Sequence, residues 1–212
     1  MVQGPLSGPR NMELDVELLS AAESGQPGAR AYFWDGPWVS LGRFQRPERV
    51  FQKRLTANWV ARPTGGRAVQ HGQDICLSVA VPLPSESSLR SLGPIYESLT
   101  SPILAAFQAL GIDAVIANDV KATSGSESAD CFSLRTGYDV TDRSTGKKLG
   151  GCALRVTNHG ALLQSSFPFG PMDSQIRGYL GVFTPFDAQA VAEAFGAAVE
   201  RVLSIGLSER TF

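Results

Sequence analysis

The sequence predicts an α+β fold in which mixed or antiparallel β-sheets are covered by helices. Aromatic and β-branched runs end at turn signals, other segments carry apolar residues at helical spacing, and these helices fall between groups of strands. With 212 residues, 43% of them hydrophobic, the chain is long enough for a sizeable buried core. We therefore expect a single domain over residues 1–212.

The helices are predicted from caps, prolines and apolar spacing. Asn11 can cap the first helix, and Pro47 suits the first position of the second. The third contains Pro102 and stops at Gly111, and the last is alanine-rich and amphipathic. The predicted helices cover residues 12–23, 47–55, 92–111 and 185–206.

The strands are predicted from short apolar and β-branched runs, of which DICLSVAVPLP is the clearest buried one. The turn signal DGP separates the first two runs, and RSTG reads as the turn of a hairpin. A plain hairpin centred on Ser144 and Thr145 pairs Lys148 with Thr141. Residues 118–129 are polar and small, which is typical of a surface loop. The predicted strands cover residues 29–34, 38–42, 58–63, 74–84, 112–117, 137–142, 147–156 and 160–169.

The overall charge and the cysteine content exclude several classes of function. The net charge of −1 argues against general binding of nucleic acid or of an anionic membrane surface. No run of about 18 apolar residues is present, so we expect no membrane span. Three cysteines and an N-terminus without a secretion signal indicate free thiols in the cytoplasm. The two histidines and three cysteines lack zinc spacing, so we expect no metal site.

The loop ARPTGGRAVQHG, residues 61–72, is a candidate binding loop. Gly65 and Gly66 allow a tight turn and a close approach to a ligand. Arg62 and Arg67 offer forked donors to a carboxylate or phosphate, and His71 offers one more. A hairpin turn with surface arginines is the alternative interpretation. The spacing matches neither GxGxxG nor the Walker loop, which disfavours common nucleotide chemistry.

The second candidate is Cys131 in SADCFSL, at the end of the polar loop. Cys76 and Cys152 lie within apolar strands and are interpreted as core residues. Cys131 could act as a nucleophile if a cation lowered the pKa of its thiol, and Lys147 and Lys148 supply such cations. Alternatively, the two lysines lie on a solvated hairpin strand. Local spacing alone does not bring the thiol and the ammonium group together.

These motifs resemble those of a known family. RPTGGRAVQH followed by ICLSV closely resembles the lipoate-binding loop of the biotin/lipoate protein ligase superfamily. GPRNMELDVELL resembles its first helix, VSLGRFQ its early strand, and GYDVTDRSTGKKLGGCALR the segment that bears its lysine. The resemblance covers residues 9–205, in the expected order, and it implies the fold of that catalytic domain.

Within this superfamily, the chain is most similar to the cysteine-dependent octanoyltransferases, which carry a cysteine before a phenylalanine where this chain has ADCF. The resemblance implies that Cys131 forms an acyl thioester and that Lys148 points at the acyl carbonyl group. It also implies no accessory C-terminal domain. The residues implied to bind the acyl or lipoyl group are Arg62, Gly65, Gly66, Arg67, His71, Gly150 and Gly151.

The resemblance further implies an octanoyl or lipoyl donor that is an acyl carrier protein or a lipoyl domain, and a lipoyl-domain lysine as acceptor. No cofactor is needed for that transfer. An ATP- and Mg²⁺-dependent lipoate ligase is one alternative. A non-catalytic acyl-binding protein is another, because the chain departs from the family pattern. The departures are Ala61, Cys152, Leu154 and Ser165.

Overall fold

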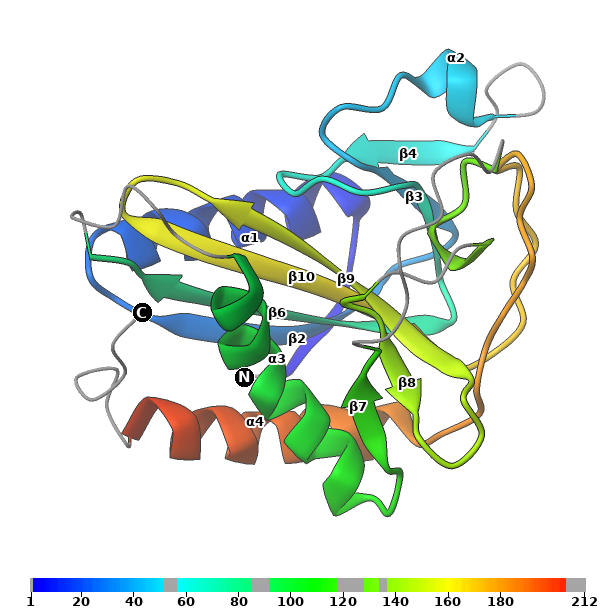
Figure 1. The fold of residues 1–212 in the computed structure, drawn as a ribbon. Coiled ribbons are helices and arrows are strands. Elements are labelled where there is room, and N and C mark those ends of the chain that lie inside the picture. The colour runs from blue at the N-terminus through cyan, green and yellow to red at the C-terminus, as the bar shows by residue number, and fades with distance from the viewer. Residues whose placement is uncertain (1, 52–56, 85–91, 118–127, 134–136, 205–212) are drawn as a thin grey trace.

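The computed structural model describes residues 2–51, 57–84, 92–117, 128–133 and 137–204 (Figure 1). Within this part of the chain, the predicted α+β fold is confirmed. A seven-stranded mixed sheet has the order β1-β2-β6-β10-β9-β8-β7. β1 and β2 are parallel and all the other neighbours are antiparallel. The strands are β1 (Val2–Leu6), β2 (Gly28–Trp34), β6 (Asp74–Pro82), β7 (Ala114–Ile116), β8 (Val140–Asp142), β9 (Lys148–Val156) and β10 (Gly160–Pro168).

A second, three-stranded sheet has the order β4-β3-β5. Its strands are β3 (Trp38–Leu41), β4 (Asn58–Ala61) and β5 (Val69–His71). The DGP turn does separate β2 from β3, but these two strands do not form a hairpin, because β3 leaves the main sheet and pairs with β4 and β5. The small sheet therefore stands beside the main sheet and carries both ends of the glycine loop.

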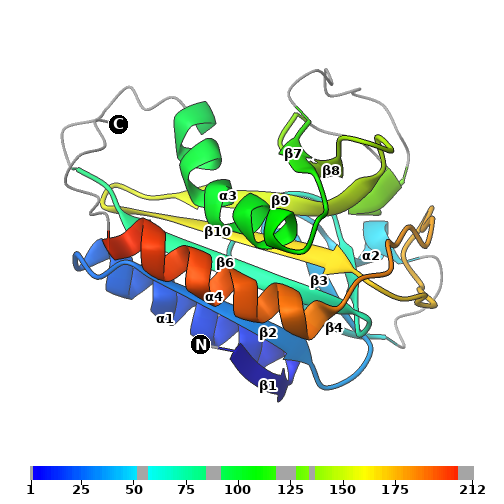
Figure 2. The ribbon, with the colours of Figure 1, turned by 90° about the horizontal axis from the view of Figure 1, so that it is seen from below.

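Helices cover the main sheet on two faces (Figure 2). α1 (Gly8–Glu23) packs against β6 and β10 on one face, whereas α3 (Leu92–Ala109) and α4 (Ala188–Ser204) pack against each other on the opposite face. The short α2 (Pro47–Val50) lies at the small sheet, and a single 3₁₀ turn, η1, covers Cys131–Ser133.

The position of β6 inside the main sheet explains why its sequence is almost continuously apolar. Ile75, Leu77 and Val79 belong to the core under α3 and α4. Cys76 and Ala80 point to the opposite face, where they belong to clusters formed with residues of α1. Successive side chains of a strand point to opposite faces of the sheet. A strand that is buried on both faces therefore has apolar residues at odd and at even positions.

The first two predicted helix boundaries need correction. α1 begins at Gly8, with Pro9 in its first turn, so Asn11 lies inside the helix instead of capping it. The Asn11 amide is buried and donates to the carbonyl oxygens of Leu6 and Phe33, which fixes α1 against the sheet. The second helix ends at Val50 among the described residues, and residues 52–55 of its predicted range lie outside them.

The hairpin prediction is confirmed. β8 and β9 are antiparallel and pair Thr141 with Lys148, with a register shift between Val140 and Thr141. Most of the predicted loop over residues 118–129 lies outside the described residues. Across the part of the chain that the structure describes, no helix combines the length and apolar character needed to cross a bilayer.

Candidate active site

A largely apolar cavity lies between α1, the main sheet and the small sheet. Met12 of α1 and Trp34 of β2 form one side, and Val69 of the small sheet forms another. The remaining lining residues are Tyr32, Ser40, Arg62, Gly66, His71, Cys76, Cys131, Gly151, Cys152, Ala153, Gln164, Ser165 and Ser166.

The glycine loop is closed on itself by Arg62. Its buried guanidinium donates to the carbonyl oxygens of Gly65 (2.6 Å) and Arg67 (2.7 Å) and to that of Ser40 (3.1 Å) in β3. Burial lowers the pKa of Arg62. The predicted forked donors of Arg62 are therefore bound to the backbone of the loop itself, and the side chain shapes the loop.

Gly66 is needed at its place in the loop because its φ is +89°, a conformation that other residues rarely adopt. A Cβ atom there would also lie 2.9 Å from the Arg62 guanidinium. The turn and its arginine clamp thus require a glycine at the same position.

Cys131 is held beside this loop by backbone pairing. The N–H of Ala68 donates to the Ala129 carbonyl (3.0 Å), and the N–H of Cys131 donates to the Ala68 carbonyl (2.9 Å). Asp130, between them, is buried and accepts from the N–H groups of Phe132 and Leu180. Burial is the main reason that the pKa of Asp130 is raised. The half-buried Cys131 therefore lies directly beside the glycine loop.

Lys148 reaches the same place from β9. Its ammonium group donates to the Cys131 carbonyl oxygen at 3.0 Å and forms an ion pair with Asp139 at 3.0 Å. The Phe132 ring centroid lies 4.9 Å from the Lys148 Nζ. The predicted convergence of Cys131 and Lys148 is present, although neighbouring Lys147 is exposed.

Gly151 leaves free space between these two side chains. A Cβ atom at this position would lie 3.3 Å from the Cys131 Sγ and 3.7 Å from the Lys148 Nζ. A reacting group placed above Gly151 can therefore contact the sulfur and the ammonium group together. Gly150, by contrast, packs against the Phe167 ring and does not line the cavity.

A second, outer cleft of about 750 Å³ begins where the cavity ends. Cys131, Gly66, Cys152 and Ala153 line both spaces. Gly65, Arg67 and Asp139 line the outer cleft, together with the stacked rings of Tyr96 and Tyr138, whose centroids are 4.1 Å apart. Cys131 thus lies at the junction of the apolar cavity and the outer cleft.

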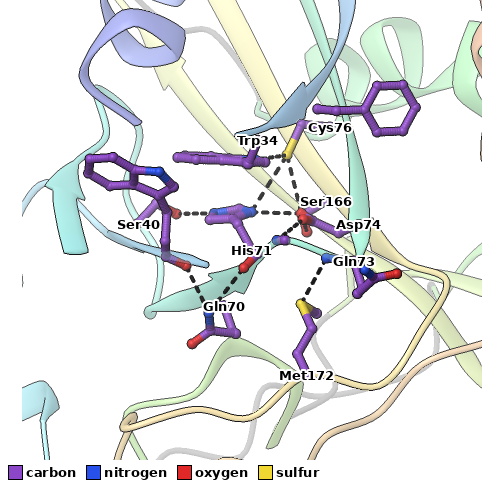
Figure 3. A network of polar contacts seen from close by, with 12 residues as sticks. Trp34, Ser40, Gln70, His71, Gln73, Asp74, Cys76, Ser166 and Met172 are labelled. Atoms are coloured by element: carbon purple, nitrogen blue, oxygen red, sulfur yellow. Dashed lines mark hydrogen bonds and ion pairs between the residues drawn. The ribbon is translucent and has the colours of Figure 1, made fainter. Parts of the chain in front are cut away.

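His71 lies in a buried polar network under the cavity (Figure 3). Its Nδ1 lies 2.6 Å from the Asp74 Oδ2, and its Nε2 lies 2.8 Å from the Ser40 Oγ. Its ring stacks on Trp34 with a centroid distance of 3.9 Å. Both ring nitrogens are engaged within the chain, so His71 positions the cavity wall.

Asp74 is the centre of this network. It also accepts from Ser166 Oγ (2.7 Å) and from the N–H of Gly72 (3.0 Å). Burial raises its pKa, but His71 and these hydrogen bonds more than offset that effect, so the pKa of Asp74 is lowered. Asp74 begins β6 and Asp139 precedes β8, and both side chains are buried and in polar contact with other side chains.

The ligand atoms of His71, Asp74 and Cys76 lie within 4.8 Å of one another, which is close enough for a metal ion. They are, however, joined by hydrogen bonds, and burial raises the pKa of the Cys76 thiol well above its ordinary value. A thiol held in its neutral form is a poor metal ligand. This donor set does not favour a metal.

A family model described as the lipoyl protein ligase A/B catalytic domain matches residues 7–205. The chain belongs to this family. Among curated relatives, octanoyltransferase LipM from Geobacillus kaustophilus is 33% identical over 165 residues, which cover 73% of this chain and 58% of the relative. LipM from Anoxybacillus flavithermus is also 33% identical, with the same coverage. The chain thus spans less than two thirds of the length of these relatives.

Solved structures of the family share the fold. A lipoate-protein ligase A bound with ATP has a TM-score of 0.73 and 17% identity, and the match covers 96% of this chain and 83% of the ligase. A bipartite lipoate protein ligase from Thermoplasma acidophilum, solved with its E2 lipoyl domain, has a TM-score of 0.63 and 17% identity with the same coverage.

The four residues that depart from the family pattern lie in different parts of the site. Leu154 lines the outer cleft, Cys152 lines both spaces, and Ser165 lines the inner cavity, where its hydroxyl donates to the Leu77 carbonyl. Ala61 is exposed at the end of β4. None of these four residues replaces the thiol, the ammonium group or the glycine loop.

Proposed function

We propose that this protein transfers an octanoyl or lipoyl group through a thioester on Cys131, from a carrier-protein or lipoyl-domain thioester to a lysine of a lipoyl domain. The position of Cys131 at the junction of the cavity and the cleft, beside the Lys148 ammonium group, carries this proposal. Membership of the family and the similarity to octanoyltransferases support it. We place the reaction in the cytoplasm, where free thiols stay reduced.

The inner cavity is suited to hold the acyl chain. Its walls carry Met12, Trp34 and Val69, and its open end lies at Cys131 and Gly66. An alkyl chain in this cavity leaves water and is stabilised by the hydrophobic effect, by about 0.8 kcal/mol for each buried CH₂ group. The carbonyl end of the chain then lies at the thiol.

The first step forms the acyl-enzyme. The Cys131 thiolate attacks the carbonyl carbon of the donor thioester, a new C–S bond forms, and the donor C–S bond breaks. The departing donor thiolate takes up the proton that Cys131 released. The ammonium group of Lys148 stabilises the oxyanion of the tetrahedral intermediate. Because one thioester replaces another, the step needs no ATP.

The second step uses the outer cleft. A neutral lysine amine of the acceptor enters past Tyr96 and Tyr138 and attacks the thioester carbonyl carbon on Cys131. The C–N bond forms, the C–S bond breaks, and the proton lost by the amine ends on the Cys131 sulfur. An amide is more stable than a thioester, so this transfer is downhill and needs no cofactor.

The test is intact mass spectrometry of the protein after mixing with an octanoyl carrier-protein thioester. The wild-type chain should gain one octanoyl group, which neutral hydroxylamine should remove as expected for a thioester. Cys131→Ala should stay unmodified, whereas Cys152→Ser should still gain the group. Addition of a lipoyl domain should then move the group to a lysine.

A second assay, of pyrophosphate release from ATP, distinguishes the transferase from the ATP-dependent ligase. Lipoate-dependent release of pyrophosphate from ATP that survives Cys131→Ala would establish the ligase and contradict the thioester route. If neither acyl donors nor ATP with lipoate lead to acylation of any protein, the chain is an acyl-binding protein without transfer activity.

A further inference from the structure

A third pocket, of about 660 Å³, lies on the small-sheet side of the molecule, and arginine side chains dominate its polar lining. Arg46 and Arg49 come from the segment around α2, and Arg67 comes from the glycine loop. Ser128 and Ala129 complete the wall next to Arg67. We call this the arginine pocket.

The charged side chains that line the arginine pocket are all positive. No acidic side chain among the described residues lines it, and Glu48, between the two arginines in sequence, is exposed but is not one of the lining residues. Arg46 and Arg49 are exposed and form no ion pair with a described residue. Asp130 lies near Arg67 but is buried and does not line the pocket. The exposed, forked guanidinium groups of Arg46 and Arg49 are suited to bind a phosphate group.

The arginine pocket is close to the thiol. Ala129, which lines it, precedes Cys131 by two residues, so their Cα atoms are at most ~7.6 Å apart. Arg67 lines both the arginine pocket and the outer cleft that contains Cys131. A ligand that reacts at Cys131 and carries an anionic group further along its length can therefore extend from the outer cleft past Arg67 into the arginine pocket.

Resting on the proposed function, we propose that the arginine pocket binds the phosphate group of the donor's pantetheine arm. In such a donor, the thioester sulfur and the phosphate are separated by an extended chain with two amide groups. The phosphate therefore lies outside the cleft that holds the thioester, in a neighbouring pocket. The amine that accepts the acyl group carries no phosphate, so the arginine pocket selects the donor.

Phe44 supports a donor arm attached to a carrier. Its side chain is 83% exposed, lines the arginine pocket, and lies under the Arg43 guanidinium at 5.4 Å from the ring centroid. An exposed aromatic ring beside arginines is typical of a surface that contacts a macromolecule. A free phosphate-containing solute would not cover this ring.

The experiment compares two donors that differ only by the phosphate group, octanoyl-pantetheine and octanoyl-4′-phosphopantetheine. The rate constant for acylation of Cys131 is measured by intact mass for each donor at low substrate concentration. The wild-type ratio should favour the phosphorylated donor about three- to tenfold. Arg46→Gln with Arg49→Gln should abolish this preference, and added NaCl should reduce it in the wild type. Arg143→Gln removes an exposed arginine of another surface and should keep the preference.

Equal rates for the two donors in the wild type, or a preference that survives the double substitution, would overturn the proposal. A double variant that keeps the donor preference but has a raised KM for ATP in lipoate-dependent pyrophosphate release would assign the pocket to a nucleotide phosphate instead. If neither donor acylates Cys131, the proposed function fails and this inference fails with it. If both donors acylate Cys131 at equal rates, only this inference fails.

Discussion

The ammonium group of Lys148 lies 3.0 Å from the carboxylate of Asp139, and both side chains are almost completely buried. Asp139 precedes β8 and Lys148 begins β9, so the hairpin itself brings the pair together. The same ammonium group donates to the Cys131 carbonyl oxygen. The ion pair therefore fixes the direction of the one cation that the proposed reaction uses.

Lys148→Met should slow acylation of Cys131 by about 10²–10³-fold, because a well-placed charge no longer stabilises the oxyanion. It should also lower the free energy of unfolding by about 3–5 kcal/mol, since the buried Asp139 carboxylate loses its ion pair with the Lys148 ammonium group. Urea unfolding and single-turnover acylation measure the two effects. Lys148→Met combined with Asp139→Leu should regain stability without regaining activity. If this pair of substitutions restores activity, Lys148 has only a structural role.

Gly151→Ala should reduce acylation with little change in the fold. The added methyl group would lie 3.3 Å from the Cys131 Sγ and would occupy the space between the sulfur and the ammonium group. The matched control is Gly196→Ala in α4, where a Cβ atom meets nothing within 4 Å. That substitution should raise the free energy of unfolding by up to about 1 kcal/mol and leave acylation unaltered. Equal acylation rates for the two variants would show that the space above Gly151 is not used.

Alkylation should distinguish the three thiols. Burial raises the pKa of Cys76 and that of Cys152, and both should therefore react slowly with iodoacetamide at pH 8. Cys131 is half-buried and opens to the outer cleft, so it should be modified first. Peptide mass mapping over time measures the order. Modification of Cys152 before Cys131 would contradict the described arrangement.

Asp74 should contribute stability at neutral pH that is lost in acid. Its folded pKa is lowered by His71, Ser166 and Gly72, below the value of about 3.9 expected for an unfolded chain. The contribution is therefore present above pH ~4 and disappears as the pH falls through the lower folded pKa. Asp74→Asn should be less stable than the wild type at pH 7, and the difference should shrink below pH ~4. Urea unfolding at both pH values tests this, and a difference that stays constant with pH argues against it.

Local sequence signals predicted most of the strands and the β8–β9 hairpin. The pairing of Thr141 with Lys148 follows from the RSTG turn, because turn length fixes register. The helix boundary at Asn11 was wrong because a buried tertiary position, in contact with Leu6 and Phe33, used a residue that is common at caps. No local signal indicates that β3 pairs with β4 and β5, because these partners lie far along the chain.

The candidate site was only partly accessible from sequence. The motif resemblance indicated Cys131 and Lys148 together, whereas local spacing did not, because Ala68 holds Cys131 through backbone hydrogen bonds that carry no side-chain signal. Asp139 and Asp74 were missed, since an aspartate beside a turn usually faces water. Their burial depends on strands that come together only in the folded sheet.

The backbone hydrogen bond between Cys131 and Ala68 connects the segment that carries the thiol directly to the glycine loop. The N–H of Ala68 donates to the Ala129 carbonyl oxygen, and the N–H of Cys131 donates to the Ala68 carbonyl oxygen. In the proposed reaction, a substitution that changes the backbone of the loop at Ala68 should therefore also displace the Cys131 thiol.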